Sequence, residues 1–137
     1  MGRAPAQTVG LLLGAVYVLV GVVGFFVTGF VPLLGDSSRA FLGVFDLNVF
    51  HNIVHVGVGA IAIAAALYLS PVETQGVNFA IGGFYILAAV IGYLGALDNL
   101  LSANRGPDPD HFLHLFSGLV FLVFGIIGKG RATARYA

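Results

Sequence analysis

The stretch VGLLLGAVYVLVGVVGFFVT, residues 9–28, is built from apolar or small residues apart from one tyrosine and a closing threonine. No Asp, Glu, Lys or Arg stands between Arg3 and Asp36. A helix needs about 20 predominantly apolar residues to cross the hydrocarbon core of a bilayer. The stretch therefore predicts a membrane-spanning helix.

Three more apolar runs follow it along the chain. We expect four spanning helices, at about residues 9–28, 48–69, 78–97 and 110–127, in one domain that covers residues 1–137. The connection that holds Pro71 and Gly76 is short, so the second and third helices should be antiparallel neighbours. Residues 31–48 and 98–108 form two long connections. The predicted fold class is an all-α membrane protein with its four helices in a compact bundle.

Composition supports this class and excludes others. Of the 137 residues, 58% are hydrophobic and 9% are charged, whereas a soluble domain carries about 25% charged residues. The formal net charge is zero, which removes the electrostatic case for nucleic acid as a partner. The chain has no cysteine, so disulfides and thiolate metal sites are excluded. The first expected partner is the lipid bilayer.

The positions of the basic residues predict an orientation. Arg3 precedes the first helix, and Lys129, Arg131 and Arg135 follow the last one, while the short central turn has no Lys or Arg. Basic residues favour the cytoplasmic side. We therefore expect a multi-pass protein of the bacterial plasma membrane with both termini in the cytoplasm and both long connections outside.

The two halves of the chain resemble each other. The shared residues are Gly14, Tyr17 and Gly24 against Gly82, Tyr85 and Gly92, and His55 and Gly59 against His114 and Gly118. Each half is one helix, a long connection and a helix that opens with histidine. Both halves start on the same side, so the pattern indicates a parallel internal repeat.

All four histidines lie in two short stretches, HNIVH at residues 51–55 and DHFLH at residues 110–114. His51 and His55 share one face of a helix, as do His111 and His114. Each stretch opens an apolar run, where an ionisable side chain is costly unless it has a partner. These stretches predict a polar layer at the extracytoplasmic mouth of the bundle.

Four interpretations of this layer stay open. In the first, it is structural: the inward histidines bond to Asn48, Asn52, Asp98, Asp110 or loop carbonyls and hold the long connections, with Asp110 also capping the last helix. In the second, it binds zinc, copper or iron, because imidazole and carboxylate groups suit these metals. Haem and proton transfer are the third and fourth. The metal candidates are His51, His55, His111, His114, Asp98 and Asp110.

Each alternative to the structural interpretation rests on a specific feature. A zinc peptidase would carry Glu after the first histidine, and Asn52 fills that position here, so peptidase chemistry lacks its base. Haem would be held between His55 and His114, with Gly59 and Gly118 leaving room for the macrocycle. Proton transfer would use the same side chains.

The pattern Asn48-x-x-His51-Asn52-x-x-His55-x-x-x-Gly59, with the later Asp-Asn-Leu-Leu and His-Leu-x-x-Gly segments, resembles a family of small four-helix membrane proteins. That family is bacterial, common in actinobacteria, and catalogued only as a domain of unknown function. The resemblance implies a four-span bundle and implies no activity.

These observations lead to one expected function and one alternative. We expect a non-enzymatic membrane protein that works as an accessory or scaffolding subunit, and that meets another membrane protein or its own copies through its lipid-facing surface. The alternative is a metal-binding or haem-binding protein that uses the histidines at the mouth.

Overall fold

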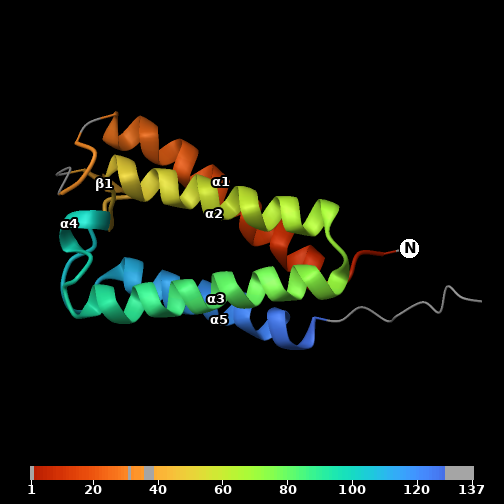
Figure 1. Cartoon of the computed structure of the whole chain (residues 1–137). Helices are drawn as coiled ribbons and strands as arrows, with labels where there is room; N and C mark the ends of the chain where they lie inside the picture. Colours follow the sequence, from red (N-terminus) through yellow and green to blue (C-terminus); the bar gives the residue numbers. More distant parts are fainter. Residues whose placement is uncertain (1, 31, 36–38, 129–137) are drawn as a thin grey trace, which may run out of the picture.

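The computed structural model describes residues 2–30, 32–35 and 39–128. Its elements, in chain order, are α1 (Pro5–Thr28), β1 (Ala40–Phe41), β2 (Phe45–Asp46), α2 (Val49–Tyr68), α3 (Pro71–Tyr93), α4 (Asp98–Leu101) and α5 (Pro109–Ile127) (Figure 1). Four of the helices are long and apolar enough to cross a membrane. The predicted all-α membrane class is confirmed, with a two-stranded hairpin added.

Two helix starts differ from the predicted ones because capping residues extend the helices. The turn expected after Pro71 is wrong: α3 begins at Pro71. Ser70 accepts a hydrogen bond from the backbone N–H of Glu73, and the Glu73 carboxylate accepts one from the backbone N–H of Ser70. This reciprocal pair is a capping box, with proline at the first helical position. Likewise α1 begins at Pro5 rather than near residue 9.

The bundle consists of two helix–loop–helix halves, in which α1 packs along α2 and α3 packs along α5 (Figure 1). Close glycine contacts hold each half together. A Cβ atom placed on Gly14 would lie 2.8 Å from the carbonyl oxygen of Gly59, and one on Gly82 would lie 2.7 Å from that of Gly118. Lipid provides no hydrophobic drive for helices to associate, so such close backbone approach is what packs them.

Both long connections gather at one end of the bundle, which we call the loop end. The β1–β2 hairpin and α4 lie there, while the start of α1 and the α2–α3 turn lie at the other end (Figure 1). The two connections are joined directly, since the backbone N–H of Gly35 donates to the carbonyl oxygen of Asn99 at 2.6 Å. At the opposite end, the N–H of Ala6 donates to the carbonyl oxygen of Gly128. The chain therefore starts and ends its bundle on the same side.

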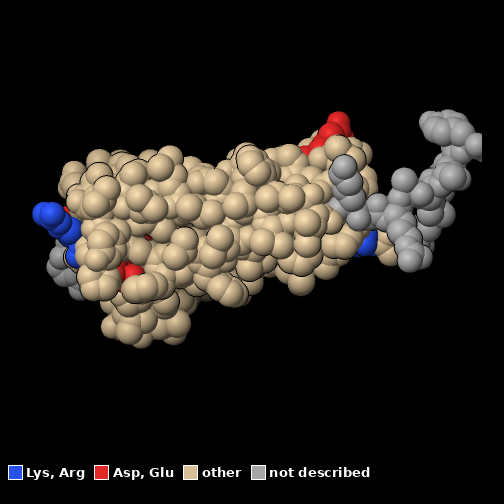
Figure 2. All heavy atoms as spheres, turned by 90° about the horizontal axis from the view of Figure 1, so that it is seen from below, with Lys and Arg blue, Asp and Glu red and all other residues tan. Residues whose placement is uncertain are grey.

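Charged residues avoid the long middle of the molecule. On the face that Figure 2 shows, Lys, Arg, Asp and Glu gather near the two ends, and other residues cover the region between them. The interior of this region is a core of Tyr17, Ala62, Ile81, Tyr85 and Phe121. This distribution is what a bilayer requires of a spanning protein.

Candidate functional site

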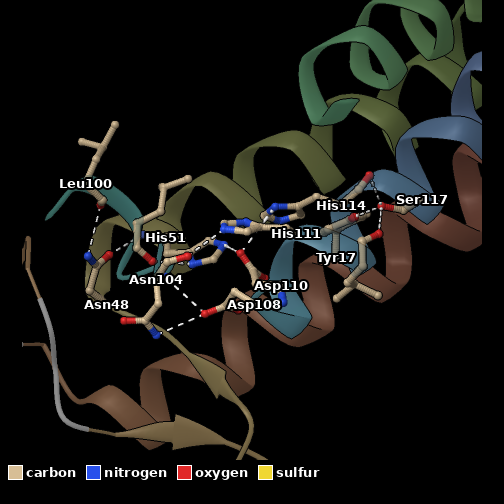
Figure 3. A network of polar contacts seen from close by, with 12 residues as sticks. Tyr17, Asn48, His51, Leu100, Asn104, Asp108, Asp110, His111, His114 and Ser117 are labelled. Atoms are coloured by element: carbon tan, nitrogen blue, oxygen red, sulfur yellow. Dashed lines mark hydrogen bonds and ion pairs between the residues drawn. The ribbon is translucent and has the colours of Figure 1, made fainter. Parts of the chain in front are cut away.

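Asn48 begins the polar layer at the loop end, where it caps α2. Its Oδ1 accepts from the backbone N–H of His51 at 2.8 Å. Its Nδ2 donates to the carbonyl oxygen of Leu100 at 3.1 Å (Figure 3). The same Nδ2 donates to the carbonyl oxygen of Gly35, also at 3.1 Å. One buried amide therefore ties both long connections to the start of α2. An asparagine at this position is a strong helix cap.

Asp108, which sequence reasoning missed, is the N-cap of α5 and replaces the predicted cap Asp110. Its Oδ1 accepts from the backbone N–H of Asp110, and its Oδ2 accepts from the backbone and side-chain N–H groups of Asn104 (Figure 3). The predicted cap is wrong because Pro109 occupies the first helical position. A proline there, preceded by aspartate, is the signal that identifies the cap.

Two histidines anchor their rings to the connections through backbone carbonyls. Nδ1 of His51 lies 2.8 Å from the carbonyl oxygen of Leu101, and Nε2 of His111 lies 2.8 Å from that of Asn104. A carbonyl oxygen only accepts, so each of these nitrogens carries a proton. In the neutral tautomer the lone pair of His51 is then on Nε2.

The inner cluster lies next to this layer and consists of His51, His55, His114 and Asp110. Each of these residues is at most 3% exposed. One ring nitrogen from each histidine lies within 4.8 Å of the other two. Oδ2 of Asp110 lies 3.7 Å from Nε2 of His51 and 3.4 Å from Nδ1 of His114. Both distances are too long for a direct hydrogen bond.

The inner cluster holds five buried polar atoms without a hydrogen-bond partner among the described residues. They are Nε2 of His51, Nδ1 and Nε2 of His55, Nε2 of His114 and Oδ2 of Asp110. The large majority of buried side-chain polar atoms in proteins have a partner, and an exception calls for a water, an ion or a functional role. Five such atoms in one small volume make the inner cluster a candidate site for bound water or an ion.

Comparison with known proteins places the chain in a family. Residues 7–127 match the family described as Domain of unknown function (DUF4383). The chain belongs to this family. The match confirms the predicted resemblance to a family of unknown function, and the family's description assigns no activity. A search of curated proteins and a search of solved structures each found no match.

Of the six predicted metal candidates, the structure brings four together and separates two. His111 bonds to the connection instead and packs against α3, where a Cβ atom on Gly92 would lie 2.6 Å from its Cε1. Asp98 is exposed at the start of α4. The remaining four candidates form the inner cluster.

The surroundings of the histidines leave little space for a haem. The ring of Tyr17 lies 5.2 Å from that of His55, and the ring of Tyr85 lies 5.0 Å from that of His114, measured between centroids. The two tyrosines stack on each other at 4.7 Å, and the Tyr17 hydroxyl bonds to that of Ser117 at 2.5 Å. Gly59 and Gly118, which were expected to leave room for the macrocycle, pack instead against α1 and α3. The packing therefore disfavours a macrocycle.

Proposed function

We propose that this protein binds one divalent transition-metal ion through His51, His55 and His114, at the loop end of a membrane-spanning bundle. The observation that carries the proposal is the group of five buried polar atoms without a partner among the described residues. Burying a polar group without a hydrogen bond costs about 1–3 kcal/mol. An ion that accepts the nitrogen lone pairs would remove most of this cost at once.

The distances support a metal after a small adjustment. Zinc–nitrogen bonds are about 2.0–2.1 Å, so nitrogens around a tetrahedral ion stand about 3.3 Å apart. The nitrogens of the three histidines lie within 4.8 Å of one another. Ion binding would therefore draw these nitrogens closer together by up to about 1.5 Å, through rotation of the imidazole rings. Imidazole ligands without thiolate suit zinc, copper and iron.

The residues around the site support it as well. The carbonyl oxygen of Leu101 orients His51 so that Nε2 faces Asp110 and the cluster. Asp110 stands beside Nδ1 of His114, the position from which a carboxylate orients a metal-binding histidine. Both nitrogens of His55 lack a partner in the described chain, so either one can act as the ligand.

The structural interpretation of the histidine layer applies to its outer part. Asn48, His51, His111 and Asp108 make the contacts that hold the long connections. These contacts use one ring nitrogen each of His51 and His111, and they leave both nitrogens of His55 and Nε2 of His114 without a partner among the described residues. His51 therefore has both roles, because its Nδ1 holds a connection and its Nε2 faces the inner cluster, whereas His55 and His114 would serve the ion alone.

We further propose that the protein acts as an accessory or scaffolding subunit without enzymatic activity, in the bacterial plasma membrane with both termini in the cytoplasm. Large apolar side chains are exposed along the helices, including Leu12, Leu19, Leu87 and Phe116. They form a surface that suits lipid, another membrane protein or a second copy of the chain. Lys129, Arg131 and Arg135, on which the orientation rests, lie outside the described residues.

An origin by duplication belongs to the same proposal. The close contact of Gly14 with Gly59 has its counterpart in that of Gly82 with Gly118. On the same alignment, His55 corresponds to His114. A metal held by both halves would then join them at the interface, where they otherwise pack less closely than the helices within each half.

Metal analysis tests the proposed function. Protein purified without a polyhistidine tag is stripped with chelator, incubated with Zn²⁺ and freed of excess ion. We expect one ion per chain in the wild type and none in His55→Ala. The matched control is His111→Ala, which removes a buried histidine outside the inner cluster and should keep the ion. A wild type without metal, or His55→Ala with a full complement, would overturn the proposal.

A further inference from the structure

A small cavity borders the inner cluster on one side. It has a volume of about 40 Å³ and lies between α1 and α5, beneath the β1–β2 hairpin. Its polar lining residues are His55 and Asp110, and its apolar ones include Val20, Phe41, Phe45 and Leu113. Both polar residues carry atoms that lack a hydrogen-bond partner in the described part of the chain. The cavity is therefore the space from which a further ligand can reach the proposed ion.

We propose that this cavity binds a neutral diatomic molecule as an additional ligand of the metal, which would then be iron(II). The inference rests on the proposed function. Three-histidine sites commonly leave one coordination position of the metal open. The inference adds that this open position faces the cavity.

The size of the cavity limits the ligand. A buried water needs about 10–15 Å³ of such space, and sites for drug-sized ligands span about 300–1,000 Å³. A cavity of about 40 Å³ therefore holds a molecule of two or three heavy atoms. Peptides, sugars and nucleotides are too large for it.

The lining of the cavity selects against charge. Apart from His55 and Asp110, its walls are aliphatic and aromatic. An anion there would meet the Asp110 carboxylate and no lysine or arginine of the lining, and burying an uncompensated charge is expensive. A neutral, weakly polar molecule avoids this cost.

The position of the cavity provides a route from the bilayer. Leu113 lines the cavity and is also 38% exposed on the surface of α5. The helices on either side of it, α1 and α5, belong to different halves and pack less closely than the partners within each half. Apolar diatomic molecules enter hydrocarbon readily, so they can approach from the lipid while ions cannot.

Nitric oxide is the ligand for the test, because its complex with non-haem iron(II) gives a distinctive electron paramagnetic resonance signal of spin 3/2. Protein in nanodiscs is loaded anaerobically with iron(II), bound iron is measured, and nitric oxide is added. We expect the signal in the wild type. Leu113→Trp, which fills the cavity, should keep its iron and lose most of the signal.

Leu115→Trp is the matched control, because Leu115 is 40% exposed on the same helix and lines a different hollow, between α3 and α5. It should keep both iron and signal. Bound iron without a signal in the wild type, or an undiminished signal in Leu113→Trp, would overturn the inference and leave the metal site standing. Binding of zinc but not of iron would also overturn the inference and leave the metal site standing. A protein that binds no metal would overturn both proposals.

Discussion

Oδ2 of Asp110 lies 3.7 Å from Nε2 of His51, although the two residues come from different halves of the bundle and both are buried. Asp110 is available for this contact because Asp108 caps α5 in its place. The first turn of α5 thus sends a carboxylate into the bundle, where it faces the histidines of α2. This contact joins the two halves at the loop end.

Asp110→Asn tests the part that the carboxylate plays. The substitution keeps the shape of the side chain and removes the charge that orients His114. Losing such an orienting partner lowers metal affinity about 10–100-fold. Competition against a coloured chelator measures the change. Asp98→Asn, at an exposed position on α4, should leave the affinity unchanged, and an equal loss in both variants would contradict the assigned role.

Asn48→Ala tests the outer contacts of the polar layer. The variant loses the cap of α2 and both bonds to the long connections, so we expect the free energy of unfolding to fall by about 2 kcal/mol. Thermal unfolding in detergent provides the measurement. Asn99→Ala removes an exposed side chain and should change little. Equal stability of the two variants would show that the Asn48 amide does not hold the loops.

Gly59→Ala tests the close packing within the first half of the bundle. A Cβ atom at Gly59 would lie 2.6 Å from the carbonyl oxygen of Gly14, whereas one at Gly57 would meet nothing within 4 Å. Overpacking of this kind typically costs about 1–3 kcal/mol. Gly57→Ala should be neutral or stabilising, because alanine favours helix over glycine by about 1 kcal/mol. Unfolding in a denaturing detergent compares them, and a Gly59→Ala as stable as Gly57→Ala would refute the contact.

The proposed orientation is tested with two single-cysteine variants of a chain that has no natural cysteine. Val44 lies in the hairpin at the loop end and is 52% exposed, while Val72 lies at the opposite end and is 64% exposed. In intact cells, a thiol reagent that does not cross membranes should label Val44→Cys and spare Val72→Cys. After the cells are opened, both should react. The reverse pattern in intact cells would invert the topology.

The number and type of the spanning helices could be predicted from the sequence because the signal is strong and local. Each helix is 19 to 24 residues long and predominantly apolar, and a bilayer admits few alternatives for such a segment. The start of α3 was misplaced because Pro71 and Gly76 are turn formers in isolation. The serine and glutamate around Pro71 form a capping box, and this signal outweighs the turn composition.

The candidate site could be predicted only in part. The sequence shows which residues are candidates, but it does not show how the packing of the two halves brings them together. The spacing of His51 and His55 indicates a shared helix face. That His114 joins them while His111 turns toward α3 depends on how the two halves pack, which no local pattern encodes. Asp98 was a reasonable candidate by residue type, but α4 leaves it exposed.

The measurement that tests the central claim most directly is X-ray absorption at the metal edge of the loaded, untagged protein. The account predicts a first shell that includes three nitrogens at about 2.0–2.1 Å, with the outer-shell scattering that imidazole rings produce. His55→Ala should hold no ion after the same loading, so this imidazole contribution should disappear with the ion. A shell made only of oxygen, or imidazole scattering that persists unchanged in His55→Ala, would contradict the account.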